Sequence, residues 1–257
     1  MTRKKFIDSE HAISEVVDFS IILAMMLLAV AIIGVAGFPL VDHMQESGHT
    51  ENIRQSFIVL TANLNKVVFG NAPSQSIELK VNGGSISATG DSNINVTMQA
   101  WNSSTSSIET QYFERQMRMI ENVFEERSIC YEGTAAWAQY PTGDAVMISK
   151  PQYVFNDNVL VIPVPMITGS SSVSGVGLVH LVSNGGEPSV YKYQNVSCIN
   201  ITIMSKYYRG WERYLNDTLE MQIITVDNTN TTVYSRRDYA DSIDVYAVQS
   251  QMGITIE

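Results

Sequence analysis

The chain has 257 residues, of which 45% are hydrophobic and 16% are charged, and its formal net charge at pH 7 is −10. Three of the 16 basic and five of the 26 acidic residues precede residue 43, which leaves 13 basic and 21 acidic residues in the remainder. Nucleic acid is therefore not expected as a partner, because such a partner needs a dense basic face, and Lys and Arg cluster only at Arg3-Lys4-Lys5 and Arg236-Arg237.

The first predicted element is a membrane-spanning helix over residues 19–41. These 23 consecutive residues carry no charge. At about 1.5 Å per residue they span roughly 34 Å, enough for a hydrocarbon core of ~30 Å. The run is apolar on every side, which is typical of a helix surrounded by lipid. A buried core helix and a cleaved signal peptide are the alternatives, although a signal peptide usually has a shorter apolar region of ~7–15 residues.

The charges that flank this run predict its orientation. Arg3-Lys4-Lys5 precedes it, whereas Asp42 and Glu46 follow it. Because basic residues favour the cytoplasmic side, residues 1–18 are expected to form a cytoplasmic leader and the bulk of the chain to lie outside the cell. The sequence thus predicts a single-pass protein of the cell membrane, with lipid as its first partner.

Residues 42–72 are predicted to form an amphipathic stalk helix. Apolar residues recur there at steps of three and four, which places them on one stripe of a helix. Gly70 and Pro73 supply the stop signal. The stripe consists of Ile53, Phe57, Leu60, Leu64, Val67 and Val68.

Residues 73–257 are predicted to form one β-rich extracytoplasmic domain, either an antiparallel sheet or a sandwich, so the expected fold class is α+β. Asn82-Gly83-Gly84 and Asn184-Gly185-Gly186 each separate two apolar runs and predict hairpin turns. Two segments have helical spacing instead, Phe113–Arg127 and Tyr207–Leu215. Strands are predicted at Ile77–Val81, Ile94–Met98, Ala145–Ser149, Val159–Val164, Leu178–Val182, Val190–Tyr193, Val196–Met204, Leu219–Val226 and Ile243–Val248.

An extracellular location allows two kinds of covalent modification. Cys130 and Cys198 can form a disulfide in an oxidising compartment, although two unrelated buried thiols are the alternative. Six Asn-x-Ser/Thr sequons are candidates for N-glycosylation. They begin at Asn95, Asn102, Asn195, Asn200, Asn216 and Asn230.

The spacing of the polar residues does not predict a catalytic or metal-binding site. His43 and His49 are six residues apart and do not match a metal pair on a helix. Residues 169–177 are rich in Gly and Ser but lack the lysine of a phosphate-binding loop, so a turn or loop is expected there. Glu125 and Glu126 are adjacent, so they do not share a helix face. No catalytic residue, metal or cofactor is therefore expected, and the protein is predicted not to be an enzyme.

Glu15 and Asp18 stand out because ionisable groups beside a membrane span are costly and are often functional. Solvation by lipid head groups is the simpler interpretation. The alternative is that Glu15 meets a charge on another subunit.

With its basic leader, the segment Ala12-Ile13-Ser14-Glu15-Val16-Val17 resembles the start of archaeal type IV pilin-like proteins. Asp18 stands where that family usually has glycine. Lys5 is not followed by the small residue that the peptidase which processes pilin leaders generally favours. The chain also looks like a family of uncharacterised archaeal surface proteins. The motifs that carry this second resemblance are Gln55-Ser56-Phe57-Ile58-Val59-Leu60, Tyr131-Glu132-Gly133, Ile162-Pro163, residues 169–175 and Gly210-Trp211-Glu212-Arg213-Tyr214.

The resemblance to pilins implies a life cycle for the protein. A prepilin-type peptidase would remove the leader, and the helices would leave the membrane and bundle as the core of an extracellular filament. Glu15 matches the residue that registers neighbouring subunits in bacterial relatives. Gly34, Ala36 and Gly37 would let neighbouring helices approach closely. A permanently anchored surface protein with a ligand- or partner-binding domain is the alternative function.

Overall fold

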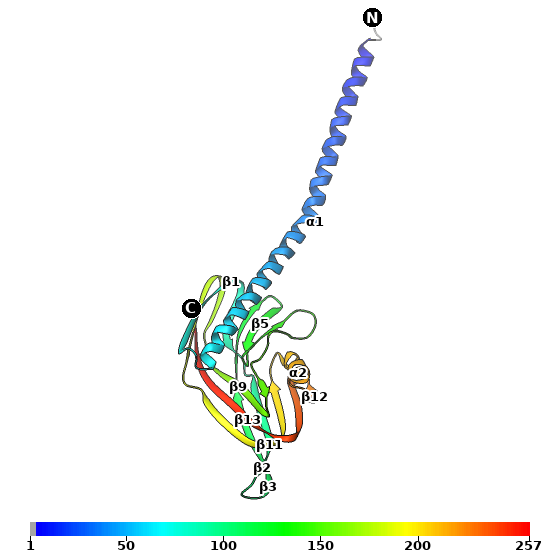
Figure 1. Ribbon diagram of the computed structural model, residues 1–257. Coiled ribbons are helices and arrows are strands. Elements are labelled where there is room, and N and C mark those ends of the chain that lie inside the picture. Colours follow the sequence, from blue (N-terminus) through cyan, green and yellow to red (C-terminus); the bar gives the residue numbers. More distant parts are fainter. Residues whose placement is uncertain (1–3) are drawn as a thin grey trace. The chain divides into compact units, whose positions relative to one another are not determined.

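The computed structural model describes the backbone of residues 4–257 and, apart from residues 4–15, Asp42, His43 and Asn82, their side chains. Helix α1 spans Lys4–Val68 and helix α2 spans Tyr208–Asp217 (Figure 1). The strands are β1 (Ser74–Thr89), β2 (Asn93–Asn102), β3 (Ser107–Gln116), β4 (Met119–Phe124), β5 (Arg127–Glu132), β6 (Ala135–Gln139), β7 (Val146–Ser149), β8 (Val154–Asn156), β9 (Val159–Thr168), β10 (Ser172–Gly185), β11 (Ser189–Met204), β12 (Gln222–Asp227) and β13 (Thr232–Ile256).

The chain divides into two compact units, residues 1–51 and residues 52–257. We refer to them as the N-terminal unit and the head. Helix α1 belongs to both, since it continues through Pro39 and past Asn52 without interruption. The last part of the predicted stalk therefore belongs to the head. The expected α+β class, a long apolar N-terminal helix followed by an antiparallel β domain, is confirmed.

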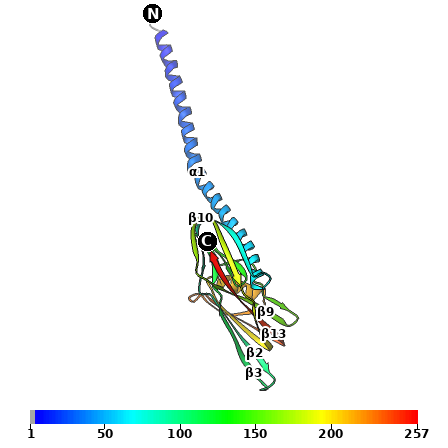
Figure 2. The same ribbon diagram turned by 90° about the vertical axis from the view of Figure 1, so that its left-hand side faces the viewer.

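Strand β13 is the spine of a 13-stranded sheet. One of its edges pairs first with β12 and then with β9, which runs parallel to it. The other edge pairs with β11 and then with β10, both antiparallel. Beyond β11 lie β2 and β3, and beyond β10 lie β1, β4, β5, β6 and β7 in that order. Figure 2 shows β13 and β9 within the head, and β2 and β3 at its far end.

The head buries two apolar clusters. One lies between the sheet and the C-terminal turns of α1, and it contains all six residues of the stripe predicted from helical spacing. The other surrounds α2 and contains Trp137 and Trp211, whose rings are tilted by 45° and have centroids 4.8 Å apart. Each helix therefore covers its own part of one bent sheet.

Both predicted hairpins are wrong. Strand β1 runs through Asn82-Gly83-Gly84 as a single bent strand, because the positive φ angles of both glycines produce a bulge and not a reversal. At Asn184-Gly185-Gly186 the chain continues in one direction. Gly185 pairs with Met252 and Ser189 pairs with Gln249, so β10 and β11 follow one another along the same edge of β13.

The two predicted helical segments have opposite outcomes. The helix predicted over Phe113–Arg127 is wrong. This segment holds the end of β3, all of β4 and the start of β5, and the positive φ angles of Arg118 and Glu125 lie in the turns between them. Their apolar residues match helical spacing only because the turns interrupt the alternation. In contrast, α2 confirms the helix predicted at residues 207–215. It buries Gly210, Trp211, Tyr214 and Leu215.

Candidate functional site

The apolar surface of α1 in the N-terminal unit is the first candidate site. Among the described side chains of residues 16–41, none is buried, and Val35 is 79% exposed. Monomeric soluble proteins rarely expose contiguous apolar surface of this extent. The helix is long and apolar enough to be a single-pass membrane anchor or a signal sequence. This apolar surface is not covered by the described part of the chain.

The small residues of this helix are not required by contacts within the described chain. A methyl group added to Gly34 would meet Phe38 at 3.7 Å, and one added to Gly37 would meet Ile33 at 3.9 Å, which are ordinary contacts within the same helix. Ala36 is exposed. These positions are thus available to a neighbouring helix.

The two acidic candidates lie on the same helix. The Asp18 side chain is exposed. Glu15 lies on the α1 backbone, but its side chain is outside the described residues. Solvation by head groups and a role in registration therefore both stay predictions for this pair.

A buried carboxyl group in the head is the second candidate site. Glu132 ends β5 and is fully buried. Its Oε1 accepts a hydrogen bond from Trp211 Nε1 at 2.7 Å, and its Oε2 accepts one from Ser205 Oγ at 3.0 Å. Burial raises the pKa of Glu132 to about 7, although both hydrogen bonds favour its ionised form. The group thus titrates near neutrality.

A second carboxyl group lies beside the first. Glu121 Oε1 accepts hydrogen bonds from Tyr207 Oη at 2.6 Å and Lys206 Nζ at 2.7 Å. Tyr207 Oη also lies 2.9 Å from Ser128 Oγ. Each contact joins the segment before α2 to β4 or β5.

Close backbone packing explains the glycines of the two motifs. A Cβ atom at Gly133 would approach Trp211 Cζ2 to 2.5 Å, and the φ angle of Gly133 is +60°. A Cβ atom at Gly210 would approach Trp137 Cε3 to 2.6 Å. The segments Tyr131-Glu132-Gly133 and Gly210–Tyr214 therefore pack closely where β5 and β6 meet α2. We call these two segments and their contacts the brace.

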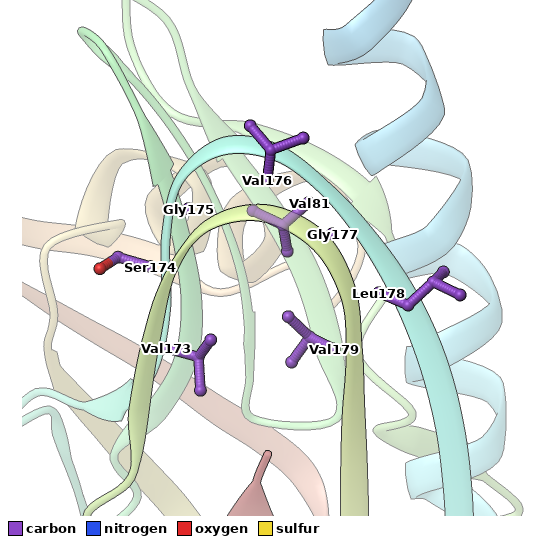
Figure 3. A pocket seen from close by; sticks show the side chains of 8 residues that line it. All are labelled: Val81, Val173, Ser174, Gly175, Val176, Gly177, Leu178 and Val179. Atoms are coloured by element: carbon purple, nitrogen blue, oxygen red, sulfur yellow. The ribbon is translucent and has the colours of Figure 1, made fainter.

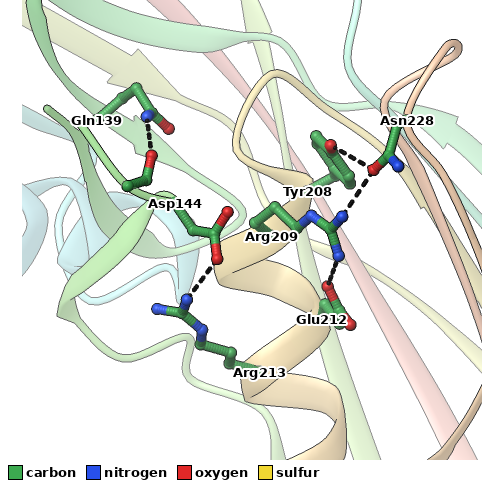
Figure 4. Close-up of polar contacts among 8 residues, drawn as sticks. Gln139, Asp144, Tyr208, Arg209, Glu212, Arg213 and Asn228 are labelled. Atoms are coloured by element: carbon green, nitrogen blue, oxygen red, sulfur yellow. Dashed lines mark hydrogen bonds and ion pairs between the residues drawn. The ribbon is translucent and has the colours of Figure 1, made fainter. Parts of the chain in front are cut away.

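The solvent side of α2 completes the brace (Figure 4). Arg209 contacts Glu212 at 2.7 Å and Asn228 at 2.7 Å, and Arg213 contacts Asp144 at 2.6 Å (Figure 4). Exposed ion pairs of this kind contribute little to stability. The attachment of α2 to the head therefore rests on the buried contacts and not on these ion pairs.

The polar groups of the brace are buried and paired within the head. Its carboxyl groups are buried behind aromatic rings and hydrogen-bonded within the head. Burial also raises the pKa of the Cys130 thiol well above its ordinary value, which makes it a poor nucleophile. Among the described side chains, no three His, Cys, Asp or Glu residues gather as a metal site.

The predicted disulfide is not formed, since Cys130 and Cys198 are both free and buried. They face different neighbours. Cys130 lies near Tyr207, and Cys198 lies near Asp238. The alternative prediction, two unrelated buried thiols, is the one that the structure contains.

The six sequons lie in two settings within the head. Asn195, Asn216 and Asn230 are exposed, although Asn230 Nδ2 donates to Asp227 at 2.7 Å. Asn95 and Asn200 are half-buried in strands β2 and β11, and half-buried Asn102 donates to Glu109. Modification of any of them stays a prediction.

The fold and these sites define a protein with one apolar N-terminal helix and a braced β head. Residues 11–255 match the family described as "Family of unknown function (DUF7289)", so the chain belongs to that family. It is similar to a protein of Archaeoglobus fulgidus that is described as "Uncharacterized protein". The two are 20% identical over 275 aligned positions, covering 86% of this chain and 88% of the relative. No solved structure matches the chain.

Proposed function

We propose that the protein is a structural, non-enzymatic subunit of the cell surface that resembles an archaeal type IV pilin. The N-terminal unit would anchor it in the cell membrane with the N-terminus in the cytoplasm and the head outside. After processing by a prepilin-type peptidase, the same helix would pack against those of other subunits in an extracellular filament.

The observation that carries this proposal is the contrast along α1. Residues 19–41 are uncharged and none of them is buried, whereas the stripe from Ile53 to Val68 is buried in the head. A helix that is apolar on all sides suits lipid before assembly and neighbouring helices afterwards. Gly34, Ala36 and Gly37 give such neighbours room for close packing.

The attachment of α1 to the head also suits a load-bearing subunit. Asn65 donates to Thr134 O at 3.0 Å and accepts from Tyr131 Oη at 3.0 Å. Tyr131 and Thr134 flank the same turn that holds Trp211 through Glu132. A pull on α1 would therefore pass through one turn to the sheet and to α2.

The first test concerns processing and assembly in native cells. N-terminal sequencing of the mature protein should give a start between His11 and Ser14. The Glu15→Ala variant should insert normally but fail to assemble, whereas Glu10→Ala, which lies in the leader, should assemble as the native protein does. Unchanged filaments in Glu15→Ala would contradict the role given to Glu15.

A permanently anchored binding protein is the second candidate. It is favoured by a polar hollow of about 350 Å³ in the head, whose wall includes Asn184, Glu187, Gln249 and Gln251. Amide and carboxylate groups of this kind can bind a polar ligand by hydrogen bonds. A native N-terminus at Met1 or Thr2 would overturn the pilin proposal and support this alternative.

A further inference from the structure

Strands β1 and β10 form an arch whose apex is apolar and exposed. Both strands bend together, β1 at Gly83-Gly84 and β10 between Gly175 and Gly177 (Figure 3). At the apex Val176 is 81% exposed and Leu178 is 64% exposed, whereas Val81 beneath them is buried. The arch encloses a small hollow lined mainly by valines and glycines.

The register of β1 places this apex at one particular end of the head. Strand β1 starts at Ser74, just after α1 ends, and packs back along the same apolar cluster as the α1 stripe. From Ser74 to Val81 a strand advances about 23 Å, and from Val68 back to Ile53 a helix advances about 23 Å. These lengths place the apex level with Ile53, at the end of the head where α1 enters it. Figure 1 labels β1 and Figure 2 labels β10 at this end of the head.

The chemistry of the apex fits a lipid surface. Residues 173–179 contain only Val, Ser, Gly and Leu. Lys80 is exposed and pairs with Leu178 across the two strands, so its ammonium group can reach lipid phosphates while the apolar side chains enter the interface. The exposed Glu125 and Glu126 follow Phe124, whose ring would lie 3.0 Å from a Cβ atom added at Gly83. In a bilayer these two carboxylates would stay in the head-group region and limit insertion to the apex itself.

We propose that Val176 and Leu178 contact the outer surface of the bilayer that residues 19–41 span. This inference rests on the proposed anchoring of α1. Only ten residues, 42–51, connect the predicted span to the head, a length of about 15 Å as a helix. The end of the head that carries the apex is therefore tethered next to the membrane, and an apolar tip at that end gains free energy by leaving water. The contact would steady the head before assembly and would be released when the helix leaves the membrane.

Spin labels on the full chain in phosphatidylcholine–phosphatidylglycerol nanodiscs test the proposal. Cysteine would be introduced at the apex in Val176→Cys, in the β2–β3 turn at the opposite end of the head in Ser104→Cys, and within the predicted span in Leu28→Cys. Both native cysteines are buried, and the unsubstituted protein measures their residual labelling. Collision rates with oxygen, which partitions into lipid, are compared with those of a water-soluble nickel chelate.

The ratio of oxygen to nickel collisions at position 176 should be several-fold higher than at position 104. Equal ratios at these two positions, with position 28 in lipid, would overturn the apex contact and leave the anchor intact. A label at position 28 that is open to the nickel chelate would instead overturn the anchor. Shielding of position 176 from both reagents would also contradict the proposal, since it would indicate a protein contact.

Discussion

Helix α1 is continuous, but its two halves differ in where their apolar side chains lie. In the N-terminal unit, the apolar side chains of residues 16–41 surround the helix and are exposed. In the head, apolar side chains occupy one stripe, and the sheet buries it. The fold of the head therefore buries the apolar side chains of the second half, whereas those of the first half stay exposed.

The same contrast separates stability from function. A residue on the stripe contributes to the packing of the head, so its replacement should change the free energy of unfolding. Under the proposed function, a residue on the exposed half would contribute to insertion or assembly, and its replacement should leave that free energy unchanged. Matched substitutions along one helix can test this division.

The largest expected effect comes from Leu60→Ala compared with Leu28→Ala. Leu60 is fully buried, so its truncation should lower the free energy of unfolding of the head by about 2–5 kcal/mol. Leu28 is 62% exposed, and its truncation should change this quantity by less than about 0.5 kcal/mol. Urea unfolding of detergent-solubilised full-length protein, followed by tryptophan fluorescence, measures both. Equal effects would show that the two halves do not differ as proposed.

The second prediction concerns how the free energy of unfolding of the head depends on pH. The head buries the carboxyl group of Glu132, whereas Asp18 beside the apolar run is exposed. The pKa of Glu132 is about 7 in the folded head, above its ordinary value of 4.5, so the folded state binds the proton more tightly. This contribution to stability is complete below pH 4.5 and is lost as the pH rises through 7. The loss should be on the order of 3 kcal/mol.

Glu132→Gln removes this titration and should flatten the dependence of unfolding free energy between about pH 5 and pH 8. The control is Glu126→Gln, whose side chain is exposed and which should keep the native slope. An unchanged slope in Glu132→Gln would mean that another group is responsible.

The sequence predicted the elements of this fold better than their connections. Helical spacing identified every residue of the α1 stripe, because steps of three and four that continue over about four turns are typical of a helix and not of a strand. Glycine pairs misled in both hairpins. Gly83 and Gly84 use their positive φ angles for a bulge and not for a reversal, and at Gly185-Gly186 the chain passes from β10 to β11 along one edge of β13. The parallel pairing of β9 with β13 joins residues about 85 positions apart, and no local pattern reports it.

The brace was visible in the sequence only as two separate motifs. Glu132 lies in a run of buried residues from Ser128 to Ala138, and an acid in so apolar a segment is a signal for a buried partner. That the partner is the indole of Trp211, 79 residues away, depends on tertiary packing. The predicted assembly residues posed the opposite problem, because their partners are expected on other molecules.

The smallest effect concerns the polar tie that fixes α1 to the head. Asn65→Ala removes the hydrogen bonds to Tyr131 Oη and Thr134 O, so it should lower the free energy of unfolding by about 1–3 kcal/mol. Asn63 is two residues away, and its Oδ1 accepts a hydrogen bond from Lys66 at the surface of the helix, so Asn63→Ala should cost less than about 0.5 kcal/mol. If the two variants unfold at the same urea concentration, the stripe alone holds α1, and a pull on the helix would reach the sheet through apolar contacts without this tie.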